Sequence, residues 1–382
     1  MKTVVKSAEI TFAEYMERAL YGPRGYYASG VAKSGRAGDY FTAPDVGPTF
    51  GRLLASIFVQ WQKRMDRSPF HLVEMGAGEG VLAEGIAKAL LDDWRSESRT
   101  FPYTAIERSP ARRESLQFVR KLFSDFRILP TLRPLIAAPV SGCFFANELV
   151  DALPVHRVRF RQGRLEEAYI TPHPSPSPLA KGRGRGEGNL QQVWGAPSTP
   201  KLQAYLDRLG LELPEDYETE INLAMNDWIR EVSQSLSRGL VVIIDYGRPA
   251  RQYYAPERSE GTLRAFHKHR LGSDPVLPLG SDPTDITADV DFTSLALDAR
   301  EAGLEPLAFM EMGSFLMLGA ERLGPEALRS ARGLRYLVHP EGLGSAFHVL
   351  VLGKGLAPEE WGFEHNRLAR LGLEDTHGER RR

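Results

Sequence analysis

The sequence predicts an α/β protein with a mostly parallel sheet, and three stretches carry this prediction. Residues 71–75 (HLVEM) indicate a strand, which is followed by a turn with three glycines and by apolar residues at helical spacing to about residue 94. Strand-like and helix-like segments then alternate between residues 101 and 153, and LVVIIDYG at 240–247 indicates a further buried strand. Alternating strands and helices form parallel sheets through right-handed crossovers, so we expect these segments to share one sheet.

Two helices and an irregular stretch are expected before this sheet. Residues 9–20 indicate an amphipathic helix, in which Thr11 and Glu14 have the spacing of a capping box. Residues 51–65 indicate a second helix with one apolar face. The glycine- and aromatic-rich residues between them have no regular period, which favours either a loop that folds over a site or a loop packed on the core.

The second half of the chain adds further α/β segments. Residues 156–170 indicate two strands joined at Gln162-Gly163, and residues 173–189, rich in Pro, Ser, Gly and basic residues, indicate a disordered insertion. Helices are expected near 201–209 and over 217–236, and two hairpin-like strands near the end, LAFMEMGSFLML and SAFHVLVLGKG. We therefore expect an N-terminal helical segment with a lid loop at 1–65, a core at 66–160 and 217–353, and an insertion at 161–216.

Composition argues against several classes of protein. The 48 Lys and Arg residues and 49 Asp and Glu residues give a formal charge of -1, so no overall basic field would recruit nucleic acid. No apolar run is long enough for membrane insertion, and the acids near the N-terminus argue against a transit peptide, so we expect a cytoplasmic protein. Cys143 lies in an apolar run and is expected to be a buried thiol. His267 and His269 have no third ligand at a convincing spacing, so no metal site is expected.

The turn after the first strand of the sheet points to a cofactor. Gly76, Gly78 and Gly80 follow the spacing G-x-G-x-G, whereas dinucleotide enzymes use G-x-G-x-x-G. Glu74 precedes them, where a carboxylate suits an ammonium group better than a phosphate, and Glu107 ends the next strand, where a ribose diol would be hydrogen-bonded. These five residues favour S-adenosylmethionine, which has an ammonium and a sulfonium group and no phosphate, and hence a methyltransferase. The alternative is a glycine turn that merely packs.

Two further strand ends are expected at the same edge, because open parallel sheets bind ligands outside the carboxyl ends of their strands. Asn147, Glu148 and Asp151 follow one strand, and Asp245-Tyr246-Gly247 ends another. Carboxylates at this edge would hold a nitrogen nucleophile in line with a methyl group, offset the charge of a cationic acceptor, or accept its proton. The competing interpretation is that Asn147 caps a helix starting at Glu148.

The sequence resembles the MidA-like family of S-adenosylmethionine-dependent methyltransferases over nearly its whole length. The resemblance rests, in order, on SGRAGDYFTAPDVGPTFG, VEMGAGEG, ANELVDALPVHR, EINLAMNDWI, IIDYG, and RSEGTLRAFHKHR followed by DPTDITADVDFT. Mitochondrial members of this family assist assembly of respiratory complex I and symmetrically dimethylate an arginine in one of its subunits. The resemblance therefore implies a class I, Rossmann-like methyltransferase core with S-adenosyl-L-methionine as cofactor.

The resemblance also assigns residues. It implies that the cofactor cleft is formed by Glu74, Gly76, Gly78, Glu107, the turn Asn147-Glu148 and the loop Gly38-Asp39-Tyr40-Phe41-Thr42. The sequence departs from the family where Ala77 replaces a frequent proline, where Leu149-Val150 replace a Phe-Phe pair, and where Asp289 replaces a frequent histidine. The change at Asp289 puts in doubt any role carried by that imidazole.

These observations predict methyl transfer to an arginine of a protein substrate, with a respiratory complex subunit as one candidate. We expect Glu148 and Asp151 to orient the guanidinium and Tyr246 or Phe41 to pack on it. Two alternatives stay open at this point. One is a non-catalytic assembly factor that binds the cofactor for stability, and the other is an NAD-dependent oxidoreductase, which Glu74 and the glycine spacing disfavour.

Overall fold

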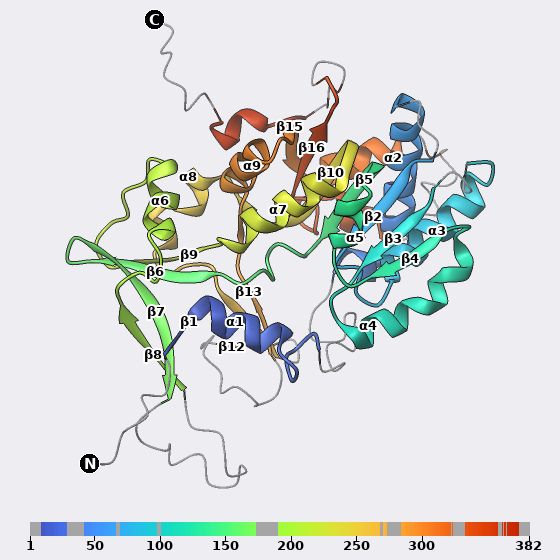
Figure 1. The fold of residues 1–382 in the computed structure, drawn as a ribbon. Coiled ribbons are helices and arrows are strands. Elements are labelled where there is room, and N and C mark those ends of the chain that lie inside the picture. The colour runs from blue at the N-terminus through green and yellow to red at the C-terminus, as the bar shows by residue number, and fades with distance from the viewer. Residues whose placement is uncertain are drawn as a thin grey trace, which may run out of the picture. The chain divides into compact units, whose positions relative to one another are not determined.

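The computed structural model describes residues 9–28, 42–65, 69–97, 101–172, 190–267, 270–272, 284–321, 323, 333–357, 361, 363 and 365–373. The chain divides into two compact units, whose elements are labelled in Figure 1. Unit 1 comprises residues 1–40, 152–224 and 251–288, and unit 2 comprises residues 41–151, 225–250 and 289–382. Residues 161–216, which were expected to form an insertion of their own, lie within residues 152–224 of unit 1, together with residues 1–40 and 251–288.

Unit 2 contains a mostly parallel sheet, which confirms the predicted α/β fold. Its strands are β2 (His71–Met75), β3 (Tyr103–Ile106), β4 (Phe126–Leu129), β5 (Val140–Asn147), β10 (Leu236–Arg248), β14 (Val290–Asp291), β15 (Glu305–Glu311) and β16 (Phe347–Lys354). Their order is β15-β16-β10-β5-β2-β3-β4, with β14 paired to the end of β10. Strand β16 runs antiparallel to β10 and β15, and the other pairs are parallel.

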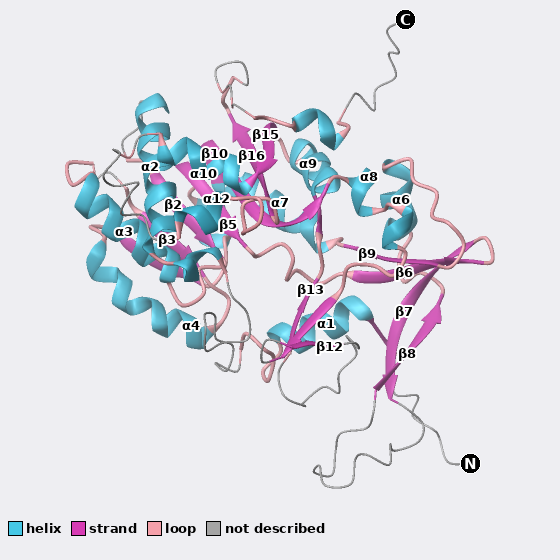
Figure 2. Ribbon diagram, turned by 180° about the vertical axis from the view of Figure 1, so that it is seen from behind, coloured by secondary structure: helices cyan, strands magenta, loops and turns pink. Residues whose placement is uncertain are grey.

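Helices cover both faces of this sheet. They are α2 (Pro48–Met65), α3 (Val81–Asp93), α4 (Pro110–Ser115), α5 (Arg133–Ala137), α7 (Ala224–Ser235), α9 (Phe292–Glu301), α10 (Met312–Ala320) and α12 (Leu334–Val338), with 3-10 turns η1 (Ala43–Val46), η3 (Leu116–Leu122) and η7 (Leu368–Leu371). Figure 2 shows α2 and α3 beside β2 and β3. Phe58 of α2 packs on Phe145 of β5 with ring centroids 5.1 Å apart, and Phe292 of α9 packs on Phe309 of β15 at 5.2 Å.

Unit 1 is built around two antiparallel sheets. The first has the order β1 (Ile10–Thr11), β7 (Arg164–Pro172), β6 (His156–Arg161) and β9 (Tyr217–Ile221), with β8 (Leu190–Gly195) also on β7. The second has the order β12 (Arg270–Gly272), β11 (Arg264–His267) and β13 (Asp285–Thr287). The helical elements are α1 (Phe12–Tyr21), α6 (Lys201–Arg208), α8 (Ala250–Tyr253) and the 3-10 turn η5 (Pro256–Arg258).

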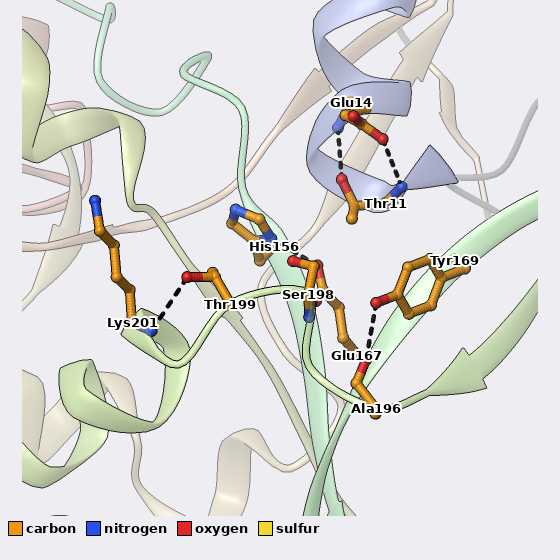
Figure 3. Close-up of polar contacts among 9 residues, drawn as sticks. All are labelled: Thr11, Glu14, His156, Glu167, Tyr169, Ala196, Ser198, Thr199 and Lys201. Carbon is orange, nitrogen blue, oxygen red and sulfur yellow. Dashed lines mark hydrogen bonds and ion pairs between the residues drawn. The ribbon is translucent and has the colours of Figure 1, made fainter. Parts of the chain in front are cut away.

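A buried carboxylate connects parts of unit 1 that are distant in sequence. Glu167 of β7 is fully buried and lies 2.7 Å from Nδ1 of His156, and its other oxygen accepts the N–H of Ser198 (Figure 3). Burial alone would raise the pKa of Glu167, but the hydrogen bonds from His156 and Ser198 lower it below its usual value. Figure 3 also shows the predicted capping box, in which Thr11 and Glu14 each accept the other's backbone N–H.

Several local expectations need correction. The helix expected over 217–236 is the strand β9 followed by α7, because residues 217–221 pair with β6 in the antiparallel sheet of unit 1 and bury Tyr217, Thr219 and Ile221 at the two-residue spacing of a strand. The stretch LAFMEMGSFLML is β15 followed by the helix α10. The helix-like segment RRESLQFVRKLF within 101–153 is the end of α4 followed by the 3-10 turn η3 from Leu116. Cys143 is fully buried, as expected, and residues 173–189 lie outside the described residues.

Candidate active site

The sheet of unit 2 has a switch point at β2. From β2 the chain adds β3 and β4 on one side, whereas β5 and β10 lie on the other side. Ligands of open α/β sheets bind at the carboxyl ends of the strands where this reversal occurs. The residues at this point are Gly76, directly after β2, and Asn147, the last residue of β5.

The three glycines of the turn are needed for different structural reasons. All have positive φ angles, of 75° at Gly76, 55° at Gly78 and 87° at Gly80. A Cβ on Gly76 would lie 3.0 Å from Cδ1 of Leu149, and a Cβ on Gly80 would lie 2.8 Å from Cδ2 of Leu116, so these two glycines allow close packing. A Cβ on Gly78 would meet only a side-chain nitrogen, at 4.0 Å. Gly78 is therefore the position where a ligand can approach the backbone.

Glu107 holds this turn from the end of the next strand. It is nearly buried, and its Oε2 accepts the N–H of Gly78 at 2.8 Å while its Oε1 accepts the N–H of Ser109 at 2.7 Å. A carboxylate can accept about four hydrogen bonds, so each oxygen keeps the capacity to accept a ligand hydroxyl. This arrangement of a carboxylate with spare acceptor capacity fits a ribose diol.

Glu74 lies beneath the turn. It is 4% exposed, and its Oε2 accepts a hydrogen bond from the hydroxyl of Tyr103. Burial raises the pKa of Glu74 to about 8; the hydrogen bond from Tyr103 opposes this effect and the charge of Glu107 adds to it. The expected contact of Glu74 with an ammonium group stays a prediction, and the contact with Tyr103 is one that the sequence did not indicate.

Glu148 has an unusual backbone conformation directly after β5. Its φ is 52°, in the left-handed region, and its N–H donates to the carbonyl oxygen of Ile244 at 2.9 Å. Its carboxylate accepts hydrogen bonds from Nδ2 of Asn147, at 3.0 Å, and from the N–H of Ala43 in η1. The interpretation of Asn147 as a helix cap is wrong, because residues 148–151 form a turn and no helix starts there.

Asn147 provides an acceptor that the described residues leave unsatisfied. Its Nδ2 donates to Glu148, whereas its Oδ1 is buried and has no hydrogen-bond partner among them. Buried polar atoms in native proteins are nearly always paired, so an orphan at the switch point indicates a missing ligand donor. The amino group of S-adenosylmethionine is a donor of this kind, and the donor set of the site therefore fits this cofactor.

Asp245 lies at the end of β10 and faces the turn that follows Glu148. It is fully buried, and its Oδ2 accepts the N–H groups of Leu149, Val150 and Asp151 at 3.2, 2.9 and 3.3 Å. Burial and the charge of Glu148 raise the pKa of Asp245 to about 8, against the opposing effect of these backbone hydrogen bonds. Sequence analysis placed Asp245 at a strand end but gave the catalytic role to its neighbour Tyr246.

The charges around Glu148 and Asp245 are mostly negative in the described part of the chain. Burial raises the pKa of Glu148 well above its usual value, and the charge of Asp151 acts in the same direction. Within the ranges that the structure describes, no lysine or arginine forms an ion pair with Glu148 or Asp245. A cation that enters this site would therefore interact with carboxylates that are not already neutralised.

Unit 2 brings most of the predicted site residues to one edge of its sheet: Glu74, Gly76, Gly78, Gly80, Glu107, Asn147, Glu148, Asp151 and Tyr246. Thr42 directly precedes Ala43, whose N–H binds Glu148. Thr42 also caps η1 through a reciprocal pair of hydrogen bonds with Asp45. The ring of Tyr246 packs on Phe347 with centroids 3.9 Å apart. Asp39 and Phe41 lie outside the described residues, so their roles stay predictions, as do the ligand contacts of the other residues.

The comparison with protein families decides the class. Residues 53–310 match the family described as "Putative S-adenosyl-L-methionine-dependent methyltransferase". The chain belongs to this family. The resemblance stated from sequence is confirmed, and so are the methyltransferase fold, the enzyme class and S-adenosylmethionine as the cofactor.

Individual relatives agree with this assignment. The methyltransferase is 28% identical to a Drosophila melanogaster protein named "Protein arginine methyltransferase NDUFAF7 homolog, mitochondrial", over 92% of this chain and 83% of that protein. The human protein arginine methyltransferase NDUFAF7 is 26% identical over 92% of this chain and 82% of its own length. A solved structure from Burkholderia thailandensis, described as a "likely methyl transferase" bound to S-adenosyl-homocysteine, matches with a TM-score of 0.76 and 28% identity, covering 91% of this chain and 89% of that one.

The comparisons also correct one expectation. The cytoplasmic location expected from the sequence is contradicted, because these relatives are named as mitochondrial proteins. In the described part of the methyltransferase, no helix is both long and apolar enough to cross a membrane.

Proposed function

We propose that this methyltransferase transfers methyl groups from S-adenosylmethionine to an arginine side chain of a protein partner. The observation that carries the proposal is the pair of buried carboxylates, Glu148 and Asp245, which form no ion pair with a lysine or arginine in the described residues. Burial raises the pKa of both, the charge of Asp151 adds to this effect at Glu148, and the charge of Glu148 adds to it at Asp245. The names of the relatives support an arginine acceptor. The family resemblance extends the proposal to a subunit of a respiratory complex as one candidate partner.

The charge of the site favours arginine over other acceptors. Desolvated carboxylates that repel each other gain most from a permanent cation, whereas a neutral hydroxyl acceptor would leave them protonated. A guanidinium group remains charged at physiological pH and offers several N–H donors in one plane, which can engage the carboxylates of Glu148 and Asp151 at once. A lysine would have to lose its proton before it could act as a nucleophile, which carboxylates at this edge would oppose.

Different residues of the site bind the cofactor and the acceptor. When bound, S-adenosylmethionine supplies an electrophilic methyl group on its sulfonium. Glu107 accepts hydrogen bonds from the ribose hydroxyls, and the unsatisfied Oδ1 of Asn147 accepts one from the amino group. Glu148 and Asp151 bind the guanidinium and hold one nitrogen in line with the methyl group, which supplies proximity.

A proton must leave the guanidinium nitrogen that forms the new bond to carbon. The raised pKa of Glu148 makes its carboxylate a better base than an exposed glutamate, so Glu148 is the group that accepts this proton. Tyr246 follows Asp245 in the chain and packs its ring against the planar guanidinium.

Transfer of a labelled methyl group tests this function. The protein is incubated with S-adenosylmethionine labelled in the methyl group and with lysate of a strain that lacks this protein, and the modified residue is identified by mass spectrometry. Label on arginine of a protein supports the proposal. Tight binding of the cofactor with no labelled product in any fraction would instead favour the non-catalytic assembly factor, and label confined to lysine, to a hydroxyl or to a small molecule would contradict the arginine assignment. The variant Glu107→Ala serves as a control that should lose cofactor binding and labelling together.

A further inference from the structure

We infer that Asp245 is a positioning residue, whose carboxylate holds the turn of residues 148–151 so that Glu148 and Asp151 face the same acceptor. This inference rests on the proposed function, because it names the group that arranges the acceptor-binding carboxylates. Asp245 itself touches neither ligand in this account.

The hydrogen bonds of Asp245 define the course of the chain after Glu148. One oxygen, Oδ2, accepts the N–H groups of Leu149, Val150 and Asp151, and the other, Oδ1, accepts the N–H of Tyr246 at 2.8 Å. A side-chain oxygen that gathers successive backbone N–H groups normally caps the start of a helix. Here no helix follows, so the same interaction serves to hold an isolated turn.

The conformation of Glu148 requires such support. Left-handed φ angles are uncommon for residues other than glycine and persist where the surrounding structure imposes them. The end of β10 supplies this constraint on both sides of Glu148, since Ile244 accepts its N–H and Asp245 binds the next three N–H groups. The direction in which the Glu148 side chain leaves the backbone is thus set by residues 244 and 245.

Asp245 also acts on Glu148 through charge. The charge of Glu148 raises the pKa of Asp245, and because repulsion between two charges is reciprocal, a charge on Asp245 also disfavours the charge on Glu148. Among the described residues, other titratable groups at this point are Asp151 in the same turn, Asp45 in η1, and His348, which is the partner of Asp245 in the β10–β16 register. Because a purely structural contact would not change the titration of Glu148, the pH dependence of the reaction can distinguish positioning from simple stabilisation.

The test compares substitutions at two buried aspartates of unit 2 that accept backbone N–H groups. Asp245→Asn keeps the size of the side chain and one acceptor oxygen but removes the charge. Asp291→Asn makes the same change at a carboxylate that is 5% exposed and caps α9 by accepting the N–H groups of Thr293 and Ser294 at 3.0 and 3.2 Å. Both variants should lose stability, but only Asp245→Asn is expected to alter the reaction.

Three readouts are expected to separate the variants. Asp245→Asn should bind S-adenosylmethionine within threefold of wild type, lower kcat for methyl transfer at least tenfold, and move the acid limb of the pH–rate profile to lower pH, because Glu148 loses a repelling neighbour. It should also speed hydrogen exchange of the amides of Leu149, Val150 and Asp151 at least tenfold. Asp291→Asn should change none of these quantities.

Hydrogen exchange keeps this inference separate from the proposed function. If wild type methylates no arginine but Asp245→Asn still exposes these three amides to exchange, the arginine proposal fails and the holding of the turn by Asp245 is supported. Unchanged exchange in Asp245→Asn would overturn the inference with any acceptor. The inference would also be overturned if an active Asp245→Asn variant kept the pH midpoint of wild type. It would equally be overturned if Asp291→Asn lost as much kcat and shifted the pH–rate profile as far as Asp245→Asn.

Discussion

Oε2 of Glu107 accepts the backbone N–H of Gly78 at 2.8 Å, which joins the end of one central strand to the turn that follows its neighbour. The other carboxylate oxygen accepts the N–H of Ser109, so a single side chain organises two backbone segments before any ligand arrives. The same oxygens retain lone pairs for hydroxyl donors. The position of the Glu107 carboxylate is therefore set by contacts that the protein makes with itself.

Replacing Glu107 with glutamine should weaken cofactor binding. The amide keeps one acceptor oxygen but turns an NH2 group toward one of the two backbone N–H groups, and it removes the charge that strengthens hydrogen bonds to hydroxyl groups. We expect the Kd for S-adenosylmethionine to rise about tenfold or more, which corresponds to about 1.4 kcal/mol, as measured by calorimetric titration. Glu84→Gln is the control, since Glu84 forms an exposed pair with Lys88 on α3. Equal affinity in Glu107→Gln and wild type would remove Glu107 from the cofactor site.

The helices α2 and α3 give a second prediction, which concerns stability. A Cβ on Gly51 would lie 2.7 Å from the carbonyl carbon of Gly85, whereas a Cβ on Gly85 would lie 3.5 Å from Cα of Gly51. Gly51→Ala should therefore destabilise the fold by about 1–3 kcal/mol through overpacking. Gly85→Ala should be neutral or stabilising by up to about 1 kcal/mol, because alanine favours helices. Denaturant unfolding measures both, and a Gly51→Ala variant as stable as wild type would contradict the packing described for these helices.

The buried Glu74 predicts a pH dependence of stability. Because its pKa is raised from 4.5 to about 8, the folded protein retains a proton between these values that the unfolded chain has lost. Stability from this group is therefore fully present below pH 4.5 and is lost as pH rises toward 8, by up to about 1.4 kcal/mol per pH unit. Glu74→Gln should flatten this decline while its amide oxygen still accepts the hydrogen bond from Tyr103. Thermal unfolding measured between pH 5 and pH 8 tests this prediction, with a substitution at an exposed residue, Asp227→Asn, as control. If the stability of Glu74→Gln declined with pH in parallel with that of wild type, the prediction would be refuted.

A segment near the C-terminus protects the edge of the sheet at β15. Asn366 accepts the N–H of Phe309 at 3.1 Å and donates to the carbonyl oxygen of Leu307 at 3.0 Å, so its side chain pairs with the strand. Asn366→Ala should lower the free energy of unfolding by about 1–3 kcal/mol, because these backbone groups lose their partners. It should also increase self-association, since an uncovered edge can pair with another strand. Asn226→Ala, which removes an exposed contact with Arg230 on α7, should have neither effect.

The parts of the site that the sequence predicted are those with a local pattern. The strand, glycine turn and helix from His71 to Asp93 follow one another directly in the sequence. Glu107 follows the next strand, so its place at the same edge of the sheet follows from the order of these elements. The helix expected over 217–236 shows the limit of this approach. Its first five residues form a strand that pairs with β6, but the apolar positions of α7 that follow made the whole stretch resemble a single helix.

Contacts between distant parts of the chain could not be predicted in this way. The carboxylate of Asp245 binds N–H groups that precede it by 94 to 96 residues, and the N–H of Ala43 reaches Glu148 across a still longer separation in sequence. The left-handed conformation of Glu148 likewise comes from its tertiary surroundings, since glutamate has no intrinsic preference for it. Sequence reasoning therefore found the acids at the strand ends but not how Asp245 arranges them.

The most direct test of arginine methylation by this acidic edge is single-turnover transfer of a deuterated methyl group to an acceptor protein, compared between wild type and Glu148→Gln at equal occupancy by S-adenosylmethionine. The account predicts deuterated methylarginine with wild type and a rate at least about 100-fold lower with Glu148→Gln, with cofactor affinity unchanged. Label on another residue type, or equal rates for the two proteins, would contradict it.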